Sequence, residues 1–284
     1  MIGTVSAPTA DPSLGDRIRS AVPHGDRGAQ AYLEIGARLD AVSRVHAEHG
    51  GVAWRSLHAT WDRPWIIAMG QDPPAVARCV MTLVDDGGRP EGITVERRAF
   101  PHLPAALRPV EHWEWDWWFT TAAPTERAGE RRVIPLEPND PRIPALLAIA
   151  SPDAMIRPGD PRIRGWWAIT ASSLAGDVAG HSQDPAAADP PATAGEHLLA
   201  VAAVTSMRPG IPHLGSVATH PQWRGRGLSR DLCARLTRDA LAEGAPAVTL
   251  GMHAANRSAR AVYSSLGYEV GYRWASGRVA AGNP

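Results

Sequence analysis

The segment from Ser216 to Ser229 joins a predicted strand to a predicted helix through a turn that contains two glycines. Gly225 and Gly227 free the backbone for left-handed dihedral angles and for close approach to a ligand. A helix that starts after such a turn presents unpaired N–H groups and the positive end of its dipole, an arrangement that binds phosphate. The segment therefore predicts an anion site. The alternative is an ordinary tight turn with solvated arginines.

Three arginines accompany the turn: Arg224, Arg226 and Arg230. Arg230 stands where a Gly-x-Gly-x-x-Gly dinucleotide-binding loop needs its third glycine, and no strand with an acidic residue follows at the required distance. All 29 basic residues of the chain are arginine. The lack of lysine excludes a Walker A phosphate loop and a Schiff-base enzyme.

The composition describes a globular chain that is not built to coat a polyanion. With 284 residues, of which 44% are hydrophobic, it has room for one large domain or two smaller ones. The 29 basic residues balance the 29 acidic ones, so we expect no nucleic-acid or membrane partner. No apolar targeting segment or span of about 18 apolar residues occurs, which predicts a cytoplasmic protein. Cys79 and Cys233 are too few for a disulfide framework, and we interpret Cys233 as a small buried residue.

The apolar periodicity predicts an α/β protein with a mixed sheet. Strands are predicted over 64–69, 93–100, 112–120, 132–136, 165–170, 197–206, 211–219, 247–253 and 268–274. Helices are predicted over 27–48, 74–84, 144–150, 225–243 and 258–266.

The composition along the chain also predicts its domain boundaries. A small, polar segment at 121–130 is interpreted as a linker between an α/β region over 15–120, of unassigned role, and a second domain over 131–278. We expect loose tails at 1–14 and 279–284 and a flexible loop at 176–196.

Two motifs in the second domain resemble one family. Gln222-x-x-Gly225-x-Gly227 resembles the acetyl-CoA signature of the GNAT (GCN5-related N-acetyltransferase) superfamily. Downstream, Asn256-x-x-Ala259-x-x-x-Tyr263-x-x-Leu266-Gly267-Tyr268 resembles the asparagine, tyrosine and Leu-Gly-aromatic pattern of that family. The resemblance covers roughly residues 130 to 278 and implies a GNAT fold there. Some actinobacterial members of this length have a comparable Trp-rich N-terminal half. A degenerate second GNAT-like unit is one alternative for that half, although it lacks the Gly-x-Gly turn.

The resemblance implies direct transfer of an acetyl group from acetyl-CoA to a primary amine of a small molecule or peptide. It implies that strands 211–219 and 247–253 splay to hold the cofactor. By position it assigns the following residues to cofactor binding: Val217, Ala218, Thr219, Arg224, Gly225, Arg226, Gly227, Leu228, Ser229 and Asn256. Asn256 has an alternative role as the N-cap of the following helix.

The resemblance also suggests catalytic residues. Tyr263 matches the general acid of the family, because a phenol with a pKa near 10 is protonated at neutral pH and can donate to a departing thiolate. The alternative is a core tyrosine. His213 occupies the position at which several members carry a carboxylate base, and an imidazole there could accept the amine proton directly or through water. A structural histidine is the alternative.

Residues 112–120 contain an unusual set of tryptophans. A strand would alternate aromatic residues with acids, and carboxylates beside aromatic rings suit a cationic amine. This predicts an acceptor pocket that includes Glu114, Trp115 and Asp116, together with Trp167. In the alternative, the tryptophans join the two halves of the protein and the acids are exposed or paired with arginine.

We expect no metal. His46 and His49 stand three residues apart on the predicted helix 27–48, and two histidines without a third ligand do not define a metal site. Both are interpreted as surface residues.

Two alternatives to an acetyltransferase fit the same sequence. One is an acyltransferase that uses another acyl-CoA, because the motif contacts CoA rather than the acyl group. The other is a non-catalytic CoA-binding sensor or interaction module. The sequence does not choose between a monomer and a homodimer.

Overall fold

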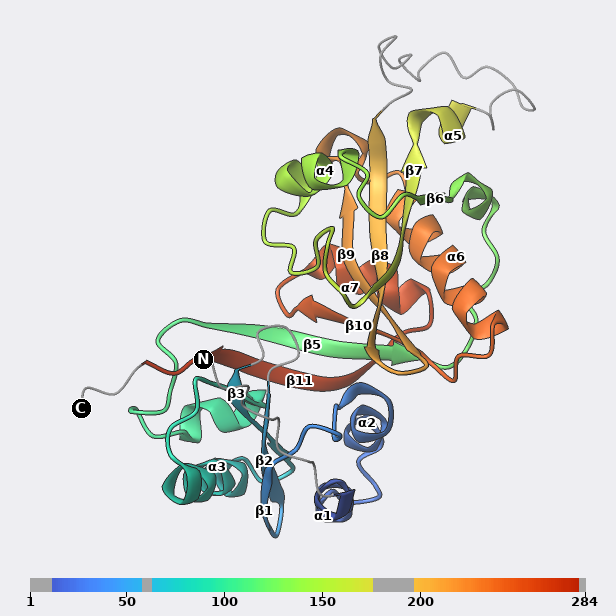
Figure 1. Cartoon of the computed structure of the whole chain (residues 1–284). Coiled ribbons are helices and arrows are strands. Elements are labelled where there is room, and N and C mark those ends of the chain that lie inside the picture. The colour runs from blue at the N-terminus through green and yellow to red at the C-terminus, as the bar shows by residue number, and fades with distance from the viewer. Residues whose placement is uncertain (1–11, 58–62, 176–196, 281–284) are drawn as a thin grey trace, which may run out of the picture. The chain divides into compact units, whose positions relative to one another are not determined.

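The computed structural model describes residues 12–57, 63–175 and 197–280, and the chain divides into two compact units (Figure 1). Unit 1 comprises Met1–Trp118, Met252–Asn256 and Val270–Pro284, and unit 2 comprises Phe119–Gly251 and Arg257–Glu269. The chain enters unit 2 at Phe119, just before the predicted linker. Its last strand, expected in the second domain, belongs almost entirely to unit 1.

Unit 1 is a mixed sheet with helices. Its helical segments are α1 (Pro12–Ala21), α2 (Arg27–Ala31), the π-helical η1 (Tyr32–Gly36), α3 (Pro73–Gly87) and the 3-10 segment η2 (Arg97–His102). Its strands are β1 (Arg44–Glu48), β2 (Gly51–Leu57), β3 (Pro64–Gly70), β4 (Gly92–Glu96), β5 (His112–Thr120) and β11 (Glu269–Arg278). Their order is β1-β2-β3-β4-β11-β5. β3 and β4 are parallel, whereas β1–β2, β2–β3 and β4–β11 are antiparallel.

The predicted helix over 27–48 is wrong beyond residue 36. Helix η1 ends at Gly36, Ala37 is extended, and residues 44–48 form β1 instead. Val45 fits a helical apolar stripe, but it pairs with Trp54 of β2 across the hairpin. The local pattern contains no information about that partner, and tertiary pairing overrides it.

Other deviations in unit 1 are smaller. Strand β2 was not predicted, and α1 covers residues 12–14, which were expected in the N-terminal tail. The predicted strand over 93–100 ends at Glu96, because η2 follows with Pro101 inside it. Strands β3 and β5 and helix α3 are confirmed. Residues 1–11 and 281–284 of the predicted tails and the predicted loop at 176–196 lie outside the described residues.

The strands of unit 2 form mixed β-sheet between helices α4 and α6 (Figure 1). Its strands are β6 (Ile134–Leu136), β7 (Ile163–Thr170), β8 (Leu198–Arg208), β9 (Ile211–Thr219) and β10 (Val248–His253), in the order β10-β9-β8-β7-β6. Its helical segments are η3 (Ala128–Arg132), α4 (Arg142–Ala150), α5 (Ala171–Ala175), η6 (Pro221–Trp223), α6 (Leu228–Ala242) and α7 (Arg257–Ser265). β6 to β9 are antiparallel and β9–β10 is parallel. The predicted strands and helices of this half are confirmed, with ends that differ by a few residues.

The two units repeat one topology. In unit 2 the antiparallel pair β8–β9 is followed by the 15-residue helix α6 and the parallel strand β10. In unit 1 the antiparallel pair β2–β3 is followed by the 15-residue helix α3 and the parallel strand β4. The connections differ: β3 reaches α3 through Gln71 and Asp72, whereas the glycine turn separates β9 from α6. An acidic N-cap such as Asp72 disfavours a phosphate at that helix start.

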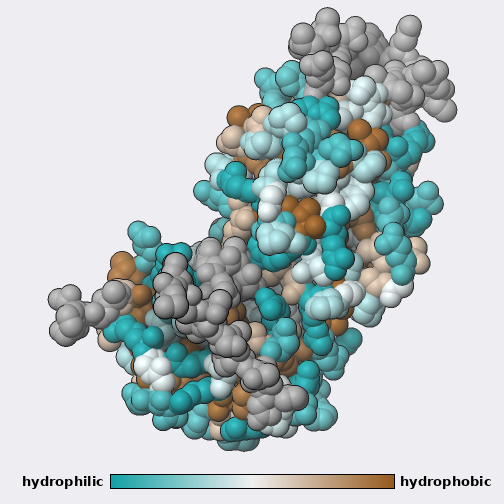
Figure 2. Space-filling view, in the orientation of Figure 1, coloured by the Kyte–Doolittle hydropathy of each residue, from teal (hydrophilic) through white to brown (hydrophobic). Residues whose placement is uncertain are grey.

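The described surface gives no sign of a membrane span. No helix in the described ranges is long and apolar enough to cross a bilayer. In the view of Figure 2, hydrophobic residues form small groups among hydrophilic ones.

Candidate functional site

Strands β9 and β10 pair over only a short stretch. His213 pairs with Thr249 and Leu214 with Leu250. Within the described part of the chain the parallel ladder contains no further pair, although β9 continues to Thr219. The backbone of β9 beyond Leu214 is therefore released from this neighbour, as expected for strands that splay around a ligand.

A β-bulge lies at the point of release. Ala203 pairs with Gly215 and Val201 with Ala218, so Ser216 and Val217 both stand opposite one residue of β8. Ser216 has a φ of 48°, a left-handed value that is unfavourable for a residue with a Cβ. Its Oγ donates to the carbonyl oxygen of Ile156 at 2.6 Å. Such local strain is concentrated at functional sites.

The glycine turn has the backbone that its sequence predicts. Gly225 and Gly227 have φ values of 79° and 80°, which only glycine adopts without cost. A Cβ at Gly225 would meet no atom within 4 Å, so the turn faces open space. Gly227 is the N-cap of α6 and supplies no side chain to cap it.

The start of α6 leaves donors available. The N–H of Asp231 donates to the carbonyl of Gly227 at 3.0 Å. The N–H groups of Leu228, Ser229 and Arg230 have no acceptor among the described residues. Free N–H groups at the positive end of a helix dipole are the arrangement with which helix starts bind anions.

Cationic and unpartnered polar side chains surround the turn. Arg226 lies 4.5 Å from the ring centroid of Trp223, and Arg224 donates to the carbonyl oxygens of Thr219 and Ala150. The Oγ1 of Thr219 and the Nε of Arg230 are buried and have no partner in the described structure. Buried polar atoms of this kind require a partner, and a bound ligand is one explanation.

An ion pair behind the turn fixes the start of α6. The Nε of Arg127 lies 2.6 Å from Oδ1 of Asp231, whose side chain is buried. Sequence reasoning missed Arg127, because it precedes Asp231 by about a hundred residues and follows no motif.

Tyr263 lies on α7, and its side chain is buried. Its ring centroid is 5.8 Å from that of Tyr268. Burial raises the pKa of Tyr263 well above its ordinary value, and nearby Cys233 and Tyr268 act in the same direction. The phenol is therefore protonated at any physiological pH, as a proton donor must be. Within the described residues its hydroxyl forms no hydrogen bond.

His213 is half-buried on β9. Burial lowers its pKa to about 4, with a smaller contribution from the positive charge of Arg162. Its Nδ1 lies 2.9 Å from Oγ1 of Thr249, which itself donates to the carbonyl of Pro212 at 3.3 Å. This network assigns the proton to Nδ1 and leaves the lone pair on Nε2. A neutral imidazole is thus present at neutral pH, but it is a weak base.

The tryptophan strand packs inside unit 1. Trp115 stacks on Trp274 with ring centroids 6.1 Å apart and donates to Oγ of Ser276 at 2.8 Å. Arg97 pairs with the fully buried Asp116 at 2.5 Å and with Glu114 at 3.2 Å. These contacts are those of the alternative in which the acids pair with arginine, and the one positive charge of Arg97 offsets part of the negative charge that would attract an amine.

The remaining predicted residues lie outside the glycine turn. Val217 is half-buried at the bulge and Ala218 is buried, facing the α4 side of the sheet. Asn256 is exposed and directly precedes α7, at the N-cap position. Trp167, on β7, is half-buried, and its ring lies over Gly165. His46 lies on β1 and His49 follows that strand, so the two histidines do not share a helix.

Comparisons with known proteins identify the fold. Residues 195–279 match the family described as FR47-like protein. Among solved structures, a GCN5-related N-acetyltransferase from Sphaerobacter thermophilus is 16% identical, with a TM-score of 0.51 over 95% of this chain and 91% of that one. A GCN5-related N-acetyltransferase from Kribbella flavida is 18% identical, with a TM-score of 0.43 over 94% of this chain and 96% of that one. We found no matching sequence among curated proteins. The chain therefore has the fold of GCN5-related N-acetyltransferases, and its residues 195–279 are similar to the FR47-like family.

Proposed function

We propose that this protein is an N-acetyltransferase that transfers an acetyl group from acetyl-CoA directly to a primary amine of a small molecule or peptide. The observation that carries the proposal is the glycine turn at the start of α6, beside the edge of β9 that β10 releases. A fold alone does not define an activity, because one fold hosts many functions and the chemistry lies in the site.

The residues present fit the chemistry of a CoA ester. The free N–H groups of Leu228, Ser229 and Arg230, with the guanidinium groups of Arg224 and Arg226, would hold its phosphates. The backbone of Val217 and Thr219 would bind the amide-containing arm, since β10 does not pair with β9 beyond Leu214. Acetyl-CoA supplies the acetyl group as a thioester with a thiolate leaving group.

Tyr263 is the proposed general acid. Its buried phenol stays protonated and would donate to the sulfur as negative charge develops there. This role explains why its hydroxyl has no hydrogen-bond partner among the described residues.

His213 is the proposed proton acceptor, through Nε2 and water. Its pKa of about 4 means that the imidazole is neutral above about pH 5. Because an ammonium group holds its proton much more strongly, the fraction of substrate amine already neutral would set much of the rate.

Thermal denaturation with acetyl-CoA, propionyl-CoA and free CoA tests the binding site. Ligand at about 100 times its dissociation constant should add about 2.7 kcal/mol of stability. Gly227→Trp should abolish the shift. An unchanged melting temperature with all three compounds would refute the proposal.

Thiol release with a panel of amines then tests catalysis. Release with acetyl-CoA and an amine supports the acetyltransferase. Faster release from propionyl-CoA would identify another acyl donor. Binding without turnover on any amine would instead identify a CoA-binding sensor.

A further inference from the structure

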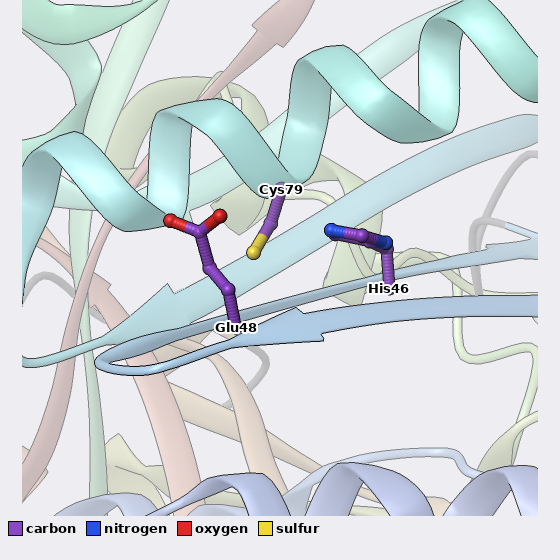
Figure 3. Close-up of side chains that lie close together, drawn as sticks. All are labelled: His46, Glu48 and Cys79. Carbon is purple, nitrogen blue, oxygen red and sulfur yellow. The ribbon is translucent and has the colours of Figure 1, made fainter.

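Three metal-ligating side chains meet between an edge hairpin of unit 1 and helix α3. Figure 3 shows the thiol of Cys79 pointing from the helix toward the hairpin, between the carboxylate of Glu48 and the imidazole of His46. One donor atom from each residue lies within 4.8 Å of the other two. His46 and Glu48 are two residues apart on β1 and therefore share one face of the strand.

The donor set suits zinc. A thiolate, an imidazole and a carboxylate are the ligands that Zn²⁺ takes in proteins, and three of them with one water complete a tetrahedron. Bond lengths of about 2.0–2.3 Å place the donor atoms roughly 3.5 Å apart in such a site. The side chains would close by about 1 Å from the present geometry, which half-buried His46 and Glu48 can do by rotation. A sulfur ligand disfavours Mg²⁺ and Ca²⁺.

Some neighbours of the cluster favour metal binding and others oppose it. The backbone N–H of Glu48 donates to the sulfur of Cys79, which favours a thiolate. Burial nevertheless raises the pKa of Cys79 to about 11, so a metal must displace its proton. Arg78 competes for the carboxylate of Glu48 at 2.5 Å, but it also lies 3.9 Å from Asp72, a second partner.

We infer that His46, Glu48 and Cys79 form a Zn²⁺ site that fastens β1 to α3. On binding, a Zn–S bond replaces the S–H bond of Cys79, and the proton leaves to solvent. Arg78 then shifts from Glu48 to Asp72, and a water molecule fills the fourth position. The site uses no residue of the proposed acyl-CoA site, so it is independent of the proposed function.

Cobalt substitution tests the site directly. Untagged full-length protein, stripped with a chelator, is titrated with Co²⁺ and then with Zn²⁺. We expect one Co²⁺ per chain with tetrahedral visible bands and a thiolate charge-transfer band in the near ultraviolet. Zn²⁺ should abolish both signals and raise the melting temperature.

Matched variants locate the ligands. Cys79→Ser should remove the charge-transfer band, whereas Cys233→Ser, at the other buried free cysteine, should keep it. His46→Ala and Glu48→Gln should each weaken Co²⁺ binding at least tenfold, and His49→Ala should not. Arg78→Ala, which removes the competitor of the metal, should strengthen binding.

Two results would overturn the inference. The first is a chelator-stripped protein that binds Co²⁺ without a thiolate band. The second is binding that survives His46→Ala and Glu48→Gln unchanged. These two variants alter half-buried strand residues, so they keep the test decisive even if Cys79→Ser does not fold.

Discussion

Nδ1 of His213 lies 2.9 Å from Oγ1 of Thr249, in the short stretch where β9 and β10 pair. The strand register alone determines this contact, because the two residues come from opposite ends of the crossover through α6. It fixes the imidazole tautomer and directs Nε2 away from Thr249. The stability and the activity of the protein should both depend on it.

Stability should fall in acid through His213. Its pKa is about 4 in the folded chain and 6.5 in the unfolded one, so the unfolded state binds more protons between these values. The contribution is complete above pH 6.5 and is lost as the pH falls toward 4, at up to about 1.4 kcal/mol per pH unit. Urea unfolding of the wild type and His213→Gln at several pH values measures it. Equal pH slopes in both proteins would contradict the expectation.

The pH profile of turnover should lack a step near pH 6.5. Because His213 is already neutral there, kcat/KM should rise with pH according to the neutral fraction of the amine. Thr249→Val should change the magnitude of kcat/KM but not the pH at which kcat/KM rises, because the substrate amine sets that pH. A change in kcat/KM near pH 6.5 that is present in the wild type and absent in His213→Gln would contradict this expectation.

Gly227→Ala should weaken acetyl-CoA binding. A residue with a Cβ at φ 80° costs about 1–2 kcal/mol, and the new methyl group stands beside the free N–H groups. Gly244→Ala is the control, because Gly244 has a φ of 93° and open space around it, at the far end of α6. Calorimetric titration should show weakened binding only in Gly227→Ala. Equal losses in both variants would indicate a general effect of backbone strain.

Tyr263→Phe should lower kcat by about 10²–10⁴-fold and leave acetyl-CoA affinity intact. Tyr268→Phe is the matched control, since its hydroxyl lies 2.7 Å from Oγ1 of Thr237, buried in unit 2. That variant should lose about 1 kcal/mol of stability and little rate. Steady-state thiol release and thermal melts separate the two effects. A normal kcat in Tyr263→Phe would exclude the phenol as the acid.

Asp231→Ala should destabilise the protein by about 2–3 kcal/mol, because it removes the buried partner of Arg127. Asp239→Ala on the same helix breaks an exposed pair with Arg235 and should cost less than about 1 kcal/mol. Chemical denaturation compares the two. Similar losses would mean that burial does not distinguish these pairs.

The glycine turn was predictable because its information is local. A left-handed backbone requires glycine, and both Gly225 and Gly227 adopt it. The spacing of apolar residues that predicted β9 and α6 is likewise local, because each pattern lies within one strand or helix. The family motif then directed attention to Tyr263, whose burial the sequence did not reveal.

The features that the sequence did not reveal are contacts between distant segments. The local pattern around Val45 predicts a helix, but Val45 pairs with Trp54 in a β-hairpin. The acids of β5 suggested an amine pocket because Arg97, their partner, lies on another segment. His46 and Glu48 likewise gain Cys79 only through the packing of α3 on the hairpin, which no local spacing encodes.

The place of β11 has a consequence for synthesis on the ribosome. Most of this strand lies inside unit 1, between β4 and β5, although it is made after all of unit 2. An emerging N-terminal half therefore has a gap in its sheet that Trp274 and its neighbours fill only late in translation. Unit 2 lacks this dependence for its sheet and can order first. Nascent unit 1 would then wait with open strand edges, which expose it to edge-to-edge association.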